Sequence, residues 1–191
     1  MSNFYISDTH LGHNNIIKHC NRPFETADIM DCTIIQNWNS VVTDRDTVYI
    51  LGDIVFSKGA KKPAEYLSKL KGKKIAIVGN HDYDISRNRE KYMDNNLLDA
   101  VYNYFEIKEI VDGKSRRVVM SHYPIVEWNG FFRGSIHLYG HIHNNIENTA
   151  FKIMSNIENA YNVSADILDF TPRTLEEVIK YNQLFKKCIS G

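Results

Sequence analysis

Histidine, aspartate and asparagine residues follow short apolar, strand-like segments at five places in this sequence. The segments are 3–7, 47–51, 75–78, 117–120 and 136–139. The polar residues that come shortly after them are Asp8 with His10, Asp53, Asn80, His122, and His141 with His143. In open α/β sheets, ligand-binding side chains gather beyond the carboxyl ends of the strands. This repeated order therefore predicts an α/β fold in which seven polar side chains converge in one pocket.

Helical periodicity separates the early strand-like segments. Met30, Ile34 and Trp38 recur at intervals of four residues and would lie on one face of a helix. Pro63 suits the first turn of a second helix, whose apolar face would include Tyr66 and Leu67. The resulting β-α-β-α-β order is typical of a layered α/β protein.

The second half of the chain has the signals of strand pairing and of a final helix. Asp112-Gly113 is a strong hairpin signal between two strand-like segments. Thr174 and Glu177 have the spacing of a capping box, which predicts where the last helix begins. Because a hairpin follows the early β-α-β units, we expect mixed strand pairing.

Composition narrows the classes of protein and of partner. The 191 residues are 43% apolar and 24% charged, and 23 basic side chains balance 23 acidic ones. A neutral chain has no overall field that attracts nucleic acid or an anionic membrane. No apolar run approaches the roughly 20 residues that span a bilayer, the N-terminus does not resemble a signal peptide, and the three cysteines form no C-x-x-C pair. We therefore expect a single cytoplasmic domain over residues 1–191, without membrane contact.

A pocket that gathers these seven side chains needs bound cations. Without one, its carboxylates would repel one another and its buried polar groups would lack partners. A mixture of histidine and aspartate suits divalent Mn, Fe, Zn or Ni, and the absence of nearby cysteine argues against a structural zinc site. Seven ligands are too many for one ion, whereas two ions that share a bridging carboxylate would use them all. Such pairs typically lie about 3.5–4 Å apart.

Five blocks of this sequence, in order, resemble the motifs of the calcineurin-like metallophosphoesterase family. The blocks are Asp8-Thr9-His10, Gly52-Asp53, Gly79-Asn80-His81-Asp82, His122, and Gly140-His141-Ile142-His143. The resemblance implies a four-layer α/β/β/α sandwich with two mixed sheets and no separate cap domain. Segments 9–15 and 21–24 are similar to a small bacterial and phage branch of the family.

The resemblance also implies a role for each matched residue. Asp8, His10 and His143 would hold one metal ion, Asn80, His122 and His141 would hold the other, and Asp53 would bridge them. The cofactors would be two divalent ions, with Mn as the first choice and Fe, Zn, Ni or Mg as alternatives. A metal-activated water would attack phosphorus. His81 would protonate the leaving oxygen or stabilise the transition state, and we expect Asp82 to orient His81.

Several further residues have both a functional and a structural interpretation. Arg22 would bind a substrate phosphate, since guanidinium matches phosphate geometry, or would form a surface salt bridge. His13 would lie near the pocket or cap a loop. His19 and His137 are interpreted as structural histidines.

Two longer segments have the same two kinds of interpretation. Aromatic residues and an arginine between the last two metal blocks would stack on a nucleobase or pack a loop. These residues are Tyr123, Trp128, Phe131, Phe132 and Arg133. Seven lysines lie in 58–74. They favour a solvated helix face over a nucleic-acid contact.

The leading hypothesis is a hydrolase of phosphate esters. We expect phosphodiesterase or phosphomonoesterase action on a small or nucleotide-like substrate. A nuclease that acts on RNA or DNA is the next hypothesis, and the balanced net charge weakens it. The rival from another class is a non-catalytic interaction module on the same fold. The sequence leaves the natural substrate and the oligomeric state open.

Overall fold

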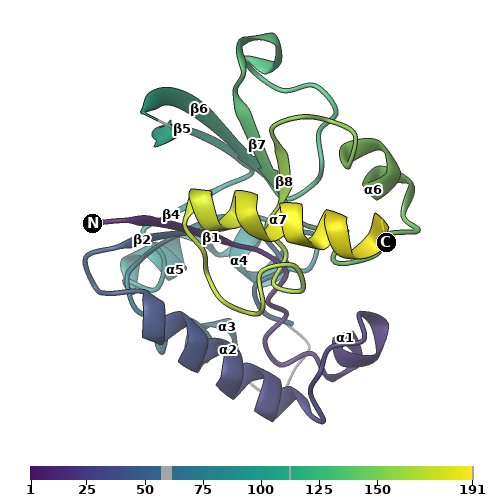
Figure 1. The fold of residues 1–191 in the computed structure, drawn as a ribbon. Coiled ribbons are helices and arrows are strands. Elements are labelled where there is room, and N and C mark those ends of the chain that lie inside the picture. The colour runs from purple at the N-terminus through teal and green to yellow at the C-terminus, as the bar shows by residue number, and fades with distance from the viewer. Residues whose placement is uncertain (57–61, 112, 191) are drawn as a thin grey trace.

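The chain forms two four-stranded sheets, in a computed structural model that describes residues 1–56, 62–111 and 113–190 (Figure 1). The first sheet has the order β1-β2-β3-β4, and every neighbouring pair is parallel. Its strands are β1 (Asn3–Ile6), β2 (Thr47–Ile50), β3 (Lys73–Ile77) and β4 (Ala100–Tyr102). The expected mixed pairing is wrong for this sheet. Its strands are joined by helical crossovers, which connect parallel neighbours.

Helices from the first half of the chain cover the outer face of the first sheet. They are α1 (Asn14–His19), α2 (Ala27–Val41), α3 (Pro63–Leu67), α4 (Tyr83–Arg87) and α5 (Arg89–Asp94). Met30, Ile34 and Trp38 of α2 are buried, as their spacing predicts. Pro63 is the first residue of α3. Met30, Ile34 and Trp38 pack in one core cluster with Tyr66 and Leu67 of α3 and with sheet residues such as Ile6.

The second sheet has the order β5-β6-β7-β8 and is mixed. Its strands are β5 (Tyr104–Val111), β6 (Lys114–Ser121), β7 (Ile136–Tyr139) and β8 (Ala160–Asn162). β5 and β6 form the antiparallel hairpin, and β6, β7 and β8 are parallel. The turn residue Asp112 lies outside the described residues, so the predicted turn type is not assigned.

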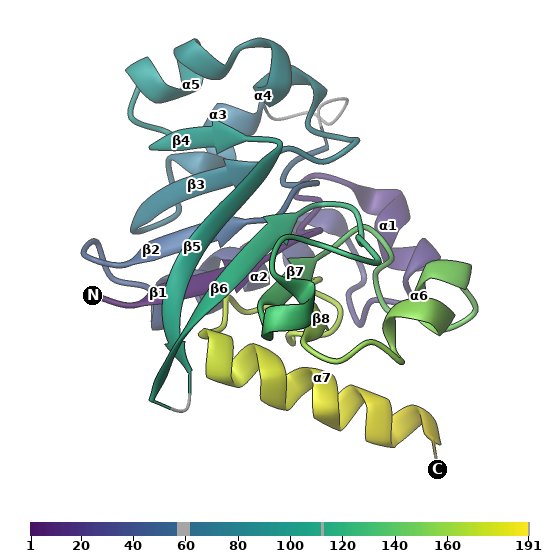
Figure 2. The same ribbon diagram turned by 90° about the horizontal axis from the view of Figure 1, so that it is seen from above.

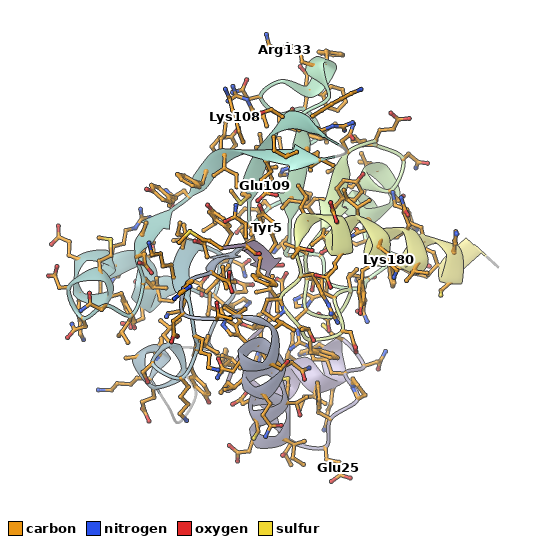
Figure 3. The ribbon with its side chains drawn as sticks, turned by 60° about the vertical axis from the view of Figure 1, so that its left-hand side comes forward. Tyr5, Glu25, Lys108, Glu109, Arg133 and Lys180 are labelled. Carbon is orange, nitrogen blue, oxygen red and sulfur yellow. The ribbon has the colours of Figure 1, made fainter. Side chains whose placement is uncertain are left out.

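The two sheets face each other across a shared core (Figure 2). Alternate residues of β1 divide between two cores, because successive strand side chains point to opposite faces. Ile6 packs toward the helices, whereas Tyr5 packs toward the second sheet. Tyr5 also donates a 2.5 Å hydrogen bond from its hydroxyl to Glu109 of β5. Figure 3 shows these two side chains close together between the sheets.

The outer face of the second sheet is covered by short elements. α6 (Thr149–Met154), the 3-10 turn η1 (Phe131–Arg133) and nearby loops pack there in a third core cluster. The long helix α7 (Leu175–Ser190) lies instead beside the edge strands β1 and β8 (Figure 2). The layers are thus α/β/β/α, as expected. None of the helices in the described ranges has the length and apolar character needed to cross a membrane.

The segment after β8 joins the two sheets at this edge. The amide of Ser7 donates to Val163 at 2.8 Å, and the amide of Ala165 donates to Ser7 at 2.9 Å. Farther along, Tyr5 and Arg173 form an antiparallel bridge. The segment therefore connects the end of β1 to the end of β8, and it brings the carboxyl ends of the two sheets together.

Candidate metal centre

All seven predicted ligands meet at the carboxyl ends of the strands. Asp8 and His10 follow β1, Asp53 follows β2, Asn80 follows β3, His122 follows β6, and His141 and His143 follow β7. Six of them form two clusters, in each of which the ligand-type atoms lie within 4.8 Å of one another. The first cluster is Asp8, His10 and His143, and the second is Asp53, His122 and His141.

Asp53 belongs to the second cluster but also faces the first. Its Oδ2 is 3.6 Å from His10 Nε2 and 3.5 Å from His122 Nε2. Asn80 belongs with the second cluster, because its Oδ1 is 3.0 Å from both His122 Nε2 and His141 Nδ1. One carboxylate oxygen thus faces a histidine of each cluster, which is the geometry that a bridging ligand requires.

His10 provides the test of whether a metal fits. The residue is 1% exposed, and neither ring nitrogen has a hydrogen-bond partner among the described residues. Burial, followed by the charges of His143 and Arg22, lowers the pKa of His10 well below its usual range. A buried imidazole that is neutral and unpartnered has a lone pair available, and a divalent cation would satisfy it.

The carboxylate of the first cluster is also fully buried. Burial raises the pKa of Asp8, although the charges of His143 and His122 oppose the shift. Its oxygens accept hydrogen bonds from the Ser7 hydroxyl at 2.5 Å and from the amide of His141 at 3.0 and 3.1 Å. A cation beside this group would favour its ionised form, so the carboxylate and the ion suit one another.

Tight backbone turns aim the ligands into the centre. Five of the seven residues have φ between 49° and 72°, a region that residues with a Cβ rarely adopt. They are Asp8, His10, Asp53, His141 and His143. The neighbouring glycines permit close approach: a Cβ on Gly140 would lie 2.3 Å from Ser7 Oγ, and one on Gly79 would lie 2.3 Å from Asp53 Oδ1.

Hydrogen bonds behind two histidines orient their rings. His122 Nδ1 is 2.8 Å from the carbonyl of Leu51, which directs Nε2 toward Asp53. His143 Nδ1 is 2.8 Å from Asp166 Oδ2, which directs Nε2 toward Asp8. Burial opposes protonation of His143, but the hydrogen bond to Asp166 and the charges of Asp8 and Asp166 outweigh it and raise its pKa to about 10.

Sequence analysis missed Asp166. Burial opposes its ionisation, but the hydrogen bond from His143 and the charge of Arg22 prevail and lower its pKa to about 2. Asp166 follows β8 just as the other blocks follow their strands. That position was the available signal, but no histidine accompanies the carboxylate.

The prediction that Arg22 binds a substrate phosphate is wrong for this geometry. Its side chain is fully buried, and its Nε donates to Asp166 Oδ1 at 2.9 Å. The remaining donors go to Asp166 Oδ2, to the sulfur of Met30 and to the carbonyls of Asp8 and Thr9. No donor is left for a phosphate, and the alternative of a surface salt bridge is also wrong because the ion pair is internal.

The expected contact between Asp82 and His81 is also wrong. Asp82 accepts hydrogen bonds from the amides of Asp53 at 2.7 Å, Ile54 at 2.9 Å and Gly79 at 2.9 Å. It therefore ties the loop after β2 to the loop after β3. The ring of His81 is exposed, and its side chain makes no hydrogen bond within the described part of the chain.

A cavity of about 400 Å³ opens beside the first cluster. His10, His81, His141 and His143 line it, together with Cys20 and several other residues. Its volume is in the range of small-molecule sites. The ring of His81 is 5.2 Å from that of His10, measured between centroids, so His81 lies at the centre without belonging to either cluster.

The three remaining histidines have different surroundings, and the structural interpretation fits His137 but not the exposed His19. His13 lines the same cavity and stacks on Phe56 with 4.0 Å between ring centroids, so it lies near the pocket. His137 is fully buried, with Nδ1 near the carbonyl of Val119 and Nε2 accepting from the amide of Ile125, as befits a structural residue. His19 lines the edge of the cavity but is exposed.

A third cluster of ligand-type atoms contains Cys20, His143 and Asp166. Both oxygens of Asp166 already accept hydrogen bonds from the Arg22 guanidinium, at 2.9 and 3.0 Å. A further cation there would be repelled by that permanent positive charge. We therefore interpret Asp166 as a partner of His143 and not as a metal ligand.

The aromatic segment divides between the centre and other places. Tyr123 is half exposed and contacts His141 edge to face, with 4.6 Å between ring centroids. Trp128 is buried and donates to Ser135, and Phe131 packs beside it. Phe132 is exposed, and Arg133 lies at an extremity of the molecule (Figure 3). Tyr123 alone of this set therefore reaches the centre.

The lysine-rich segment 58–74 lies partly outside the described residues. Within the described part, Lys62, Lys69, Lys71 and Lys73 are exposed, but all four lie outside α3, so the predicted helix face is wrong and the solvated lysines belong to loops and to the start of β3. Lys74 is the exception, because it is buried and its ammonium donates to the carbonyls of Leu70 and Gly72, each at 3.0 Å.

Comparisons with known proteins agree with this geometry. The family model described as calcineurin-like phosphoesterase matches residues 4–163. An uncharacterized protein of Methanocaldococcus jannaschii is 35% identical over 179 residues, which cover 93% of this chain and 89% of that protein. The gene 66 protein of Mycobacterium phage L5 is 31% identical over 166 residues, 75% of this chain and 78% of the phage protein. A crystal structure of a protein of unknown function from Aquifex aeolicus has a TM-score of 0.67 and 27% identity, and the match covers 93% of this chain and 97% of that one.

Proposed function

This chain belongs to the calcineurin-like phosphoesterase family, and we propose that it uses two divalent metal ions to hydrolyse small or nucleotide-like phosphate esters. Family membership by itself implies a metal-dependent phosphoester hydrolase. The observation that carries the finer proposal is the position of Asp53, whose Oδ2 faces a histidine of each ligand cluster. In this proposal residues 1–191 act as a single metallophosphoesterase domain.

Each ion has its own ligand set in this proposal. Asp8, His10 and His143 would hold the first, and Asn80, His122 and His141 would hold the second, with Asp53 shared. When bound, the two ions would polarise the phosphoryl group and lower the pKa of the attacking water. Histidine, carboxylate and amide ligands suit Mn, which is our first choice, and also Fe, Zn, Ni or Mg.

His81 is the proposed proton donor. Its exposed ring lines the cavity, and its amide donates to Asp53 Oδ1 at 2.8 Å, which anchors the backbone beside the centre. An imidazole whose ring nitrogens have no hydrogen-bond partner among the described residues can approach the leaving oxygen and give it a proton as the ester bond breaks. The proposal assigns binding and orientation to the seven ligands and proton transfer to His81.

The cavity and Tyr123 support a substrate of nucleotide size. A volume of about 400 Å³ suits a small molecule. The half-exposed ring of Tyr123 beside His141 offers an apolar face on which a base or another aromatic group could stack. A long polynucleotide would gain little from a chain whose basic and acidic residues balance, at 23 each.

The alternative of a non-catalytic interaction module has less support. Such a module would be expected to lack some of the ligands or the proton donor. Here every position of the predicted set is present, and the side chains converge.

Hydrolysis assays on the Mn-loaded protein test the proposal. We expect turnover of bis-p-nitrophenyl phosphate or p-nitrophenyl phosphate, with loss of activity on chelation and recovery when Mn is restored. A panel of diesters, monoesters, cyclic nucleotides and RNA would define the substrate class. A loaded protein that is inert on every substrate would contradict the enzymatic proposal and favour the interaction module.

A further inference from the structure

A buried ion pair stands behind the first ligand cluster. Arg22 and Asp166 have side-chain exposures of 0% and 2%, and two hydrogen bonds of 2.9 and 3.0 Å join them. Asp166 Oδ2 also lies 2.8 Å from His143 Nδ1 and accepts from the Ser164 hydroxyl at 3.0 Å. The carboxylate thus has a full set of partners, which a buried charge requires.

Arg22 also holds the other side of the first cluster. Its Nη2 donates to the carbonyl of Asp8 at 2.6 Å, and its Nη1 donates to the carbonyl of Thr9 at 3.0 Å. Asp8 is one of the residues in the left-handed region, with φ of 54°. One guanidinium therefore supports the strained turn that presents Asp8 and, through Asp166, the ring of His143.

The second cluster has different supports. His122 is oriented by the backbone carbonyl of Leu51, and the loops that present Asp53 and Asn80 are tied together by Asp82. Among the described residues, neither Arg22 nor Asp166 hydrogen-bonds to a residue of this cluster. The side chains of Arg22 and Asp166 therefore support the first cluster alone, although the backbone amides of His10 and His141 join the two clusters through Asp53 and Asp8.

We infer that Arg22 and Asp166 are positioning residues for the ion of the first cluster and not for the ion of the second. The inference rests on the proposed metal centre. Asp166 holds the ring of His143 at Nδ1 and so directs Nε2 toward Asp8, and Arg22 holds the Asp166 carboxylate in place. Partners of this kind typically change metal affinity by about 10–100-fold.

Metal binding to the full-length Asp166→Asn and Arg22→Lys proteins tests this inference. Isothermal titration with Mn should find two ions on the wild type. In both variants one ion should bind about 10–100-fold more weakly, while the affinity of the other stays within about threefold. Electron paramagnetic resonance gives a second measurement. The wild type loaded with two equivalents of Mn should have the spectrum of a coupled Mn pair. Each variant, given enough Mn to fill only its unaffected site, should have the spectrum of an isolated ion.

Matched variants keep the result interpretable. Arg117→Lys alters another arginine–carboxylate pair, with Glu106 on the β5–β6 hairpin, and should leave both affinities unchanged. His143→Ala removes a ligand of the first cluster. Its titration should lack the first ion only, and it therefore shows what selective loss of that ion looks like. If the two main variants do not fold, Ser164→Ala removes one hydrogen bond to Asp166 and should weaken the same ion a few-fold.

Three outcomes would overturn the inference: equal weakening of both ions, no weakening of either, or a wild type that binds no ion. Failure of the proposed function is a separate result. A wild type that binds two ions but hydrolyses no ester would contradict the enzymatic proposal, and the selective loss of one ion in the variants would still support the roles of Arg22 and Asp166.

Discussion

At the scale of single residues, the centre combines strained backbone with buried polar groups. Residues with a Cβ that adopt a left-handed conformation cost about 1–3 kcal/mol each in such settings, and five of the candidate ligands do so. Hydrogen bonds such as those from Arg22 to the carbonyls of Asp8 and Thr9 offset part of this cost. This concentration of strain is typical of a functional site.

His81→Ala separates catalysis from metal binding. Because His81 lies outside both ligand clusters, the variant should bind two ions with affinities close to those of the wild type. Loss of a general acid typically lowers turnover by about 10²–10⁴-fold. Titration calorimetry and steady-state kinetics would measure the two effects. A variant that loses its ions together with its activity would instead make His81 a structural or ligating residue.

Tyr123→Leu tests the stacking role of the half-exposed ring. The variant keeps an apolar side chain but loses the aromatic face beside His141. We expect kcat/KM for nucleotide esters to fall about 5–150-fold, since stacking on a base contributes about 1–3 kcal/mol. The value for a small alkyl phosphate ester should stay nearly constant. Equal losses on both substrates would mean that Tyr123 supports His141 and does not contact a base.

His137 should make the metal-free protein less stable in acid. Burial lowers its pKa to about 4, although the hydrogen bond to Val119 opposes the shift. An unfolded histidine has a pKa near 6.5, so between these values the unfolded chain binds a proton that the folded chain does not. The contribution of His137 to stability is unchanged above pH 6.5 and falls below it, by about 2 kcal/mol at pH 5.

Urea unfolding of the chelated protein at pH 7 and pH 5 measures this effect. A His137→Gln variant should lose less stability over that interval than the wild type, by about 2 kcal/mol. His19→Gln, at the exposed end of α1, should behave like the wild type. If the wild type and His137→Gln have the same pH dependence, the histidine does not titrate as its burial implies.

At the scale of elements, the candidate ligands lie in the loops that directly follow the strands. Gly140, in the loop after β7, shows how tightly these loops pack. A Cβ there would lie 2.5 Å from Asp8 Oδ2 and 2.3 Å from Ser7 Oγ. A Gly140→Ala variant should therefore displace the end of β1. We expect a loss of about 1–3 kcal/mol in the free energy of unfolding, together with weaker metal binding.

Gly134→Ala is the matched control for that experiment. Its φ of 74° makes alanine unfavourable, but a Cβ there meets nothing within 4 Å. The control should lose about 1 kcal/mol of stability and keep its metal affinity. Chemical unfolding and metal titration measure both variants. Equal metal affinity in Gly140→Ala and the wild type would contradict the close packing described at β1.

The elements also show what sequence could and could not predict. Most strands and α2 were predictable because apolar runs and periodic spacing are local signals, as Met30, Ile34 and Trp38 illustrate, whereas the three-residue strand β8 was not predicted. The ligand blocks were predictable because each follows its own strand. The pair of Arg22 and Asp166 was not, since 144 residues separate its members and only the folded chain brings them together. Asp82 was misassigned for the same reason, because its partners Asp53 and Ile54 belong to another strand's loop.

At the scale of the whole molecule, the centre belongs to both sheets. Asp8, His10, Asp53 and Asn80 follow strands of the first sheet, and His122, His141 and His143 follow strands of the second. The segment after β8 connects the two sheets beside them. Metal binding should therefore depend on the packing of the sheets, and ions that bind the folded chain should stabilise it in turn.

Anomalous diffraction from a crystal of the Mn-loaded protein tests the central claim most directly. The account predicts two Mn peaks about 3.5–4 Å apart, one on each side of the Asp53 carboxylate, with His10 and His143 near one ion and His122 and His141 near the other. A single peak, or Mn bound away from Asp53, would contradict the two-metal centre proposed for this phosphoesterase.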